Sequence, residues 1–174
     1  AEIDGHLIFF PLGGSTLALW SSRLQNLNRP EFHLYDRDTA PPDAAKYQEH
    51  VDAVNGREGC VAQCTGKLEI ENYLHIEAIT AAYAELNIEI GRDQNFGPFE
   101  DVPSEVARLV HEQSESLTPW DELDEEKRGK KVSRAKRVLC SQAPMYMTPD
   151  LLNEIDPDGE LLGWLNEISQ ILRQ

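Results

Sequence analysis

The chain has 174 residues, of which 40% are apolar and 27% are charged, and its net charge is −15. This size suits one domain, and the composition is typical of a globular protein. The sequence holds no run of about 18 apolar residues and no basic flank before its first apolar run. We therefore expect no membrane span and no signal peptide, and a cytoplasmic protein. The negative charge opposes non-specific attraction to nucleic acid.

The first half of the chain alternates strand-like and helix-like patterns. We expect a strand that ends at a Gly13-Gly14 turn, a capped helix, a second strand, a helix that stops at Asn55-Gly56, and a third strand. In residue numbers these are 6–12, 15–28, 31–36, 42–55 and 59–65. Strands joined through helices pair in parallel, with helices covering both faces of the sheet.

The second half is mostly helical in pattern. We expect helices at residues 76–86, 104–113, 130–140 and 161–172, with a short strand at 87–90 and helix starts or turns at Thr148-Pro149 and Asp158-Gly159. The predicted fold class is therefore α/β, a parallel sheet with flanking helices plus a helical C-terminal extension. Residues 1–92 would form the sheet core, and residues 93–174 would complete the same domain.

Two aspartates, Asp36 and Asp38, follow the second predicted strand. Ligands bind beyond the carboxyl ends of strands in open parallel sheets. In extended chain, side chains two residues apart point to the same side, with Cα atoms roughly 6.5–7 Å apart. Such a carboxylate pair predicts a Mg²⁺ site, since this ion prefers oxygen ligands. The alternative is that both aspartates are turn or cap residues.

Further charged residues stand downstream. Glu69 and Glu71 alternate with apolar residues, which on the residues alone favours exposed surface positions. Lys131 begins a predicted helix, where it either stabilises charge at a phosphodiester site or is a solvated lysine. The run from Lys127 to Arg137 holds seven of the sixteen basic residues, next to an acidic stretch at 120–126. It is either a basic helix that meets a negative partner or a solvated face.

The three cysteines, Cys60, Cys64 and Cys140, form no CxxC pair. Their odd number favours reduced thiols that behave as small buried apolar side chains.

Taken in order, HLYDRD at 33–38, IENYL at 70–74 and GKKVSRAK at 129–136 resemble the Toprim nuclease domain of the OLD (overcoming lysogenization defect) family of ATP-dependent endonucleases. The resemblance covers about residues 6 to 140. It implies a Toprim-like fold and a metal-dependent endonuclease of bacterial antiviral defence. It also implies Mg²⁺ or Mn²⁺, two ions in all, with DNA or RNA as the substrate.

The resemblance also implies residue roles. Asp36 and Asp38 match the metal ligands, and Glu71 matches a ligand for a second metal. Lys131, four residues before Ala135, matches the lysine that serves catalysis. Gly13 and Gly14 match the glycine turn beside the site. Glu69 has no role from the resemblance and is a supporting candidate only because it follows the third predicted strand closely.

The chain also departs from the family pattern. The Toprim glutamate on an earlier strand, in a Glu-Gly-x-x-Asp context, has no match, because Glu2 and Asp4 lie directly before the predicted strand. We expect a fragment that lacks the first strand and helix. There is no GxxxxGK[ST], so ATP would act only through a separate ATPase domain. Homo-oligomers are expected from the resemblance.

Two other functions stay open. A Toprim-like module that binds nucleic acid or a protein without cutting would explain the missing glutamate. A haloacid-dehalogenase-type phosphatase would use Asp36 as its nucleophile in a DxDx[TV] motif. That motif normally follows the first strand of its domain, and here a predicted strand and helix precede it. IENYL would also go unexplained.

Overall fold

The computed structural model describes residues 4–11, 19, 23–114 and 116–173. The chain divides into two compact units, residues 1–66 with 159–174, and residues 67–158. This division differs from the expected boundary at 92/93, because the C-terminal helix groups with the strands and the break falls directly after the second of them. Within the described ranges, no helix combines the length and the apolar content needed to cross a membrane.

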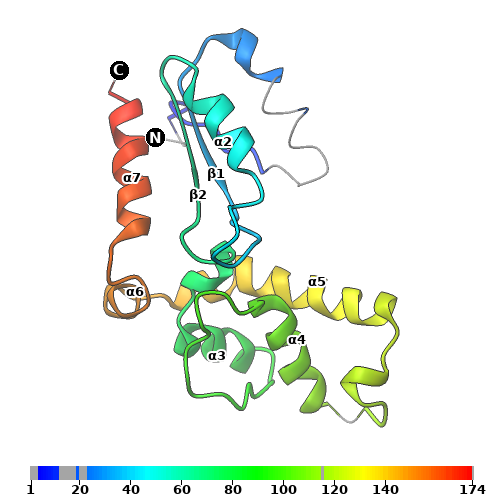
Figure 1. Ribbon diagram of the computed structural model, residues 1–174. Helices are drawn as coiled ribbons and strands as arrows, with labels where there is room; N and C mark the ends of the chain where they lie inside the picture. The colour runs from blue at the N-terminus through cyan, green and yellow to red at the C-terminus, as the bar shows by residue number, and fades with distance from the viewer. Residues whose placement is uncertain (1–3, 12–18, 20–22, 115, 174) are drawn as a thin grey trace. The chain divides into compact units, whose positions relative to one another are not determined.

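The first unit contains a two-stranded parallel sheet. Strands β1 (Glu31–Tyr35) and β2 (Cys60–Cys64) pair in parallel, with Glu31 opposite Cys60 and Tyr35 opposite Cys64. Helix α2 (Gln48–Asn55) lies between them in the chain and packs on β2, and α7 (Glu160–Ile171) packs against β1 (Figure 1). A short 3-10 helix, η2 (Gln25–Leu27), precedes β1. The predicted strand–helix–strand order and the parallel pairing are confirmed, and the fold is mixed α/β.

Buried polar side chains support this small sheet. On β1, His33 bonds Tyr35 through Nδ1 at 2.8 Å and Glu31 through Nε2 at 2.7 Å. The guanidinium of Arg57 donates to Glu31 at 2.6 Å. Behind β2, the Asn55 side chain accepts from the Ala62 N–H and donates to its carbonyl. The face of β1 that carries Glu31, His33 and Tyr35 is therefore a row of hydrogen-bonded polar groups.

The prediction of a first strand at residues 6–12 is wrong. Residues 7–11 of the first predicted strand form no strand, and Ile8, Phe9 and Phe10 are exposed. Strand structure requires a neighbour for the backbone, and an apolar run alone does not supply one. Gly13, Gly14 and most of the predicted helix at 15–28 lie outside the described residues.

The helix expected from Pro42 begins only at Gln48. Arg37 and Thr39 side chains donate to the carbonyl oxygens of Asp43 and Ala44, at 2.9 and 2.6 Å. These bonds hold the segment before α2 in turns, because side chains that bond nearby backbone groups compete with the helix. The helix ends at Asn55 as predicted, with Gly56 as its C-cap.

The second unit is helical. Its α-helices are α3 (Ile76–Ala84), α4 (Val102–Glu112), α5 (Glu125–Ser141) and α6 (Pro149–Ile155), and its 3-10 helices are η3 (Ile70–Tyr73), η4 (Trp120–Glu122) and η5 (Ala143–Tyr146). The side chains of Asp101, Asp124 and Thr148 cap α4, α5 and α6 by accepting a backbone N–H. The core lies between α3, α4 and α5 and includes Ile79, Val106 and Leu139.

The helices predicted at 76–86, 104–113, 130–140 and 161–172 are confirmed with shifted ends; α5 begins five residues earlier than expected because Asp124 caps it. The strand expected at 87–90 is wrong, since no strand occurs there and Ile90 is fully buried among the helices. Asn87 and Gly91, on either side, have φ of +57° and +54°, which break extended backbone.

Candidate functional site

Asp36 and Asp38 lie at the carboxyl end of β1, where a ligand of a parallel sheet is expected. Both carboxylates are close enough to Cys64, the last residue of β2, to raise the pKa of its thiol, although burial is the larger cause and Arg37 opposes it. Asp38 has φ of +57°, so the chain leaves extended conformation after Tyr35. The same-side geometry expected of extended chain therefore does not carry over to this pair.

Lysine and backbone groups already organise this loop. Lys46 Nζ donates to Asp38 Oδ2 at 2.8 Å, and this bond raises the pKa of Lys46 above its ordinary value. The Arg37 N–H donates to Thr65 Oγ1 at 2.9 Å, and the Thr65 N–H donates to the Tyr35 carbonyl. The ends of both strands are thus tied together directly beneath the two aspartates.

Glu69 and Glu71 lie in the second unit, at and within η3, and they share one lysine. Lys136 Nζ, from α5, is 2.7 Å from Glu69 Oε2 and 3.3 Å from Glu71 Oε1. Glu71 is 1% exposed, so the expectation from the residues alone that it is a surface residue is wrong. Its side chain points inward because the 3-10 helix turns this position to the core rather than alternating it outward.

Burial and charge act in opposite directions in this carboxylate–lysine cluster of Glu69, Glu71 and Lys136. Burial lowers the pKa of Lys136, but the bond with Glu69 and the charge of Glu71 outweigh it, so the pKa is raised. Burial also raises the pKa of Glu69, and Lys136 offsets this only in part. Glu71 Oε1 accepts from Cys140 Sγ at 3.4 Å, while its Oε2 is buried without a hydrogen-bond partner.

Lys131 lies elsewhere on α5. It borders a small hollow of about 90 Å³ between α3, α4 and α5, with Tyr83, His111 and Arg134. Five residues along a helix turn the side chain by about 140°, so Lys131 and Lys136 point to different sides. The structure thus brings Lys136, and not Lys131, to Glu71. Sequence reasoning missed Lys136, although its position between the core residues Val132 and Leu139 was a usable signal.

The rest of the IENYL motif stabilises the fold. Asn72 is buried, and its side-chain amide donates to the carbonyl oxygens of Gly97 and Glu100, each at 2.9 Å. The Tyr73 hydroxyl accepts from the Lys67 N–H, and Lys67 Nζ lies over the Tyr73 ring. Among the buried polar side chains of this motif, only Glu71 has an oxygen atom, Oε2, without a hydrogen-bond partner.

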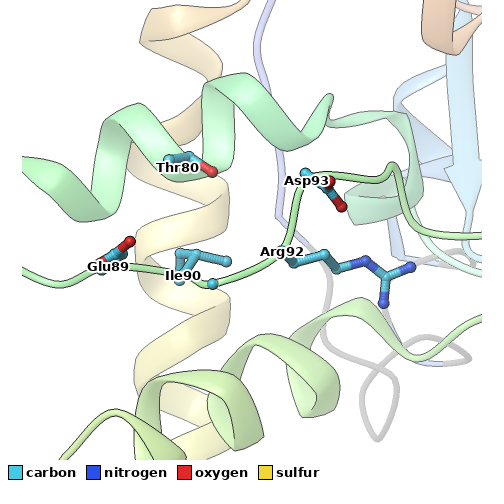
Figure 2. Close-up of a pocket in the computed structure, with 6 residues that line it drawn as sticks. Thr80, Glu89, Ile90, Arg92 and Asp93 are labelled. Atoms are coloured by element: carbon cyan, nitrogen blue, oxygen red, sulfur yellow. The ribbon is translucent and has the colours of Figure 1, made fainter.

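A second hollow, larger than the one beside Lys131, contains none of the predicted site residues. It has a volume of about 440 Å³ and lies beside α3, along residues 89–93 (Figure 2). Its polar side chains are Thr80, Glu89, Asp93 and Arg92. The guanidinium of Arg92 bonds the carbonyl oxygens of Gln94 and Asn95, so it serves the loop.

The carboxylates fit a hard divalent ion by their chemistry, since Mg²⁺ and Mn²⁺ take oxygen ligands. The orphaned, buried Oε2 of Glu71 is consistent with such a ligand. Within the described ranges, no group of three or more His, Cys, Asp or Glu side chains is already arranged around one point. Asp36 and Asp38 belong to one unit and Glu69, Glu71 and Lys131 to the other, so each group stands by itself.

We compared the chain with protein-family models, with curated proteins and with solved structures, and no match was found in any of the three.

Proposed function

We propose that this chain is the nuclease domain of an OLD-type ATPase–nuclease, a Toprim-like Mg²⁺- or Mn²⁺-dependent enzyme that hydrolyses phosphodiester bonds of DNA or RNA. The observation that carries the proposal is the position of Asp36 and Asp38, directly after β1 at the carboxyl end of a parallel strand pair. The resemblance of HLYDRD and IENYL to the family adds the reaction class. The ATPase domain, self-association and a role in bacterial defence belong to the same proposal.

The proposal assigns distinct roles to the carboxylates. Asp36 and Asp38 hold one divalent ion, and Glu71 is a ligand for a second. When bound, such ions supply positive charge that stabilises the attacking and leaving oxygens of the phosphodiester. Lys46 and Lys136 offset part of the negative charge of these carboxylates, because Lys46 lies within bonding distance of Asp38 and Lys136 within bonding distance of Glu71.

Metal binding tests the proposal. We expect the wild-type chain to bind Mn²⁺ in calorimetry, and we expect Asp36→Asn/Asp38→Asn to lose most of that heat, because oxygen ligands carry the affinity. The matched control is Glu49→Gln/Asp52→Asn on α2, which removes the same charge from the same unit.

The control variant should bind as the wild type does, and plasmid cleavage with Mn²⁺ should follow the same pattern. If the double asparagine variant binds Mn²⁺ with unchanged affinity, Asp36 and Asp38 are turn residues and the nuclease proposal fails at its first step.

A second candidate, a non-catalytic Toprim-like module, is favoured by one observation. Lys46 already pairs with Asp38, and Lys136 already pairs with Glu69 and Glu71. In such a module the ion pairs are purely structural. This candidate predicts that neither the wild type nor Asp36→Asn/Asp38→Asn gives a heat of Mn²⁺ binding, and that both keep the binding of nucleic acid or protein.

A further inference from the structure

Basic side chains collect on one side of α5. Positions 130, 134 and 137 are spaced by four and three residues, which places them within an arc of about 60° on a helix. Adding positions 127 and 131 widens the arc to about 120°. We call this set the basic stripe: Lys127, Lys130, Lys131, Arg134 and Arg137. All are exposed except Lys131, which is half-buried.

Five basic groups outside the stripe are already paired. Lys46, Arg57, Arg92, Arg108 and Lys136 each lie within 3.1 Å of a carboxylate. In the part of the chain that the structure describes, Arg128, Lys131, Arg134 and Arg137 of α5 form no ion pair. Outside α5 the same holds for three separate residues, Arg29, Arg37 and Arg173, of which Arg37 bonds carbonyl oxygens. Unneutralised positive charge is therefore concentrated on α5.

Within the basic stripe, the N-terminal lysines are only loosely held. Lys127 and Lys130 pair with Asp124 and Glu126 on the first turns of the same helix, and all four side chains are more than half exposed. Such surface pairs contribute little and exchange readily with another anion. The acidic residues Asp124 and Glu126 therefore balance only the N-terminal end of the stripe. The interpretation of the stripe as a solvated face does not account for Arg134 and Arg137 at its C-terminal end.

The side of α5 that faces away from Lys130, Arg134 and Arg137 is already used. Ala135 and Leu139 are buried there in the core of the second unit, and Val138, beside Lys131, is buried as well. A helix that binds a lipid surface needs a free apolar face beside its basic one, and α5 has none to offer. The partner is therefore an anion that binds through electrostatic attraction, without an apolar contact. The eleven residues from Lys127 to Arg137 span about 15 Å, which matches about four phosphates of one duplex strand.

We propose that the basic stripe binds the phosphate backbone of a nucleic acid. The inference rests on the proposed function for the identity of the polyanion and adds the surface that holds it. Binding is independent of sequence, because side chains that reach phosphates read no base edges. The net charge of −15 repels nucleic acid elsewhere on the chain, so the stripe sets where it can approach.

The test measures how salt weakens binding. A fluorescent 20-residue DNA, single-stranded and duplex, is titrated with the chain in EDTA at 50 to 200 mM salt. The variant is Lys130→Gln/Arg134→Gln/Arg137→Gln, which spares the predicted catalytic residues. The control is Arg29→Gln/Arg108→Gln/Arg173→Gln, with the same change of net charge from other surfaces.

We expect the stripe variant to lower the slope of log K against log salt by about 2 to 3, since each lost phosphate contact contributes about 0.7–0.9. We also expect it to weaken binding at 50 mM salt by about tenfold or more, while the control stays within about twofold of the wild type. Equal slopes for the stripe variant and the wild type overturn the inference. Absence of DNA binding with stripe-dependent binding to phosphatidylserine vesicles overturns it in favour of a membrane surface.

The two proposals fail separately. Mn²⁺ binding that depends on Asp36 and Asp38, with no stripe effect on DNA, overturns the basic stripe alone. A stripe effect on DNA without Mn²⁺ binding supports the stripe and overturns the nuclease.

Discussion

Adjacent residues of one short motif serve different purposes in this protein. Glu71 and Asn72 are both about 1% exposed. The Asn72 amide satisfies two loop carbonyls, whereas Glu71 keeps one oxygen unbonded. A buried carboxylate oxygen without a partner is costly and marks a place where a further donor or cation would be stabilising.

Tyr83 gives a prediction about pH. Burial raises its pKa to about 12, although the charge of Arg134 opposes the shift. Because the folded pKa lies above the ordinary value of 10, the neutral hydroxyl contributes stability that is fully present below pH 10. That stability is lost as the pH rises from about 10 to about 12.

We therefore expect the wild type to lose about 2–3 kcal/mol more unfolding free energy than Tyr83→Phe between pH 10 and pH 12. Urea unfolding followed by circular dichroism at pH 9 to 12 measures this difference. Parallel curves for the two proteins would show that Tyr83 titrates normally. Tyr35, whose pKa is also raised to about 12, offers the same comparison in the first unit.

At the scale of elements, one lysine joins η3 to α5. Lys136 is the only described side chain that ion-pairs with both Glu69 and Glu71, from a helix more than sixty residues further along the chain. Removing one member of such a group leaves a buried charge uncompensated, which costs more than the pair itself contributes.

We expect Lys136→Met to lower the free energy of unfolding by about 2–4 kcal/mol, since methionine keeps the apolar stem and removes the charge. Lys130→Met, on the exposed side of the same helix, should change it by less than about 0.5 kcal/mol. Urea unfolding at pH 7 compares the two. Equal effects would mean that Glu71 is solvated, and recovery in Glu71→Gln/Lys136→Met would locate the cost on the carboxylate.

At the scale of the whole molecule, the two units have cores of very different size. Among the described residues, the buried cluster of the first unit consists of Tyr35, Val51, Val54 and Ala62, whereas that of the second contains thirteen residues. Local opening requires less free energy where fewer apolar contacts are broken. The units should therefore differ in how often their backbone opens.

We expect amides of α3, α4 and α5 to exchange with deuterium more slowly than those of β1, β2 and α2. Peptide-resolved mass spectrometry at neutral pH measures this order. Leu139→Ala, at a fully buried position, should speed exchange in the second unit, and Met145→Ala, which is 81% exposed, should not. Equal protection in both units would contradict the argument from core size.

The sequence alone determined the features that depend on nearby residues. The order strand–helix–strand fixed the parallel pairing of β1 and β2, and Thr148-Pro149 marked the start of α6. Asp36 and Asp38 were placed at the end of β1 by the same pattern. Caps and periodicity act over a few residues, so the sequence carries them directly.

Only the tertiary structure decided the long-range pairings. Lys136 meets Glu69 and Glu71, Asn72 bonds the loop at Gly97, and α7 joins the first unit, all across more than twenty residues of chain. The exposed apolar side chains Ile8, Phe9 and Phe10 are a further example, since their pattern predicted a strand that the structure does not form. Contacts of this kind depend on which elements pack together, and local sequence patterns do not specify that packing.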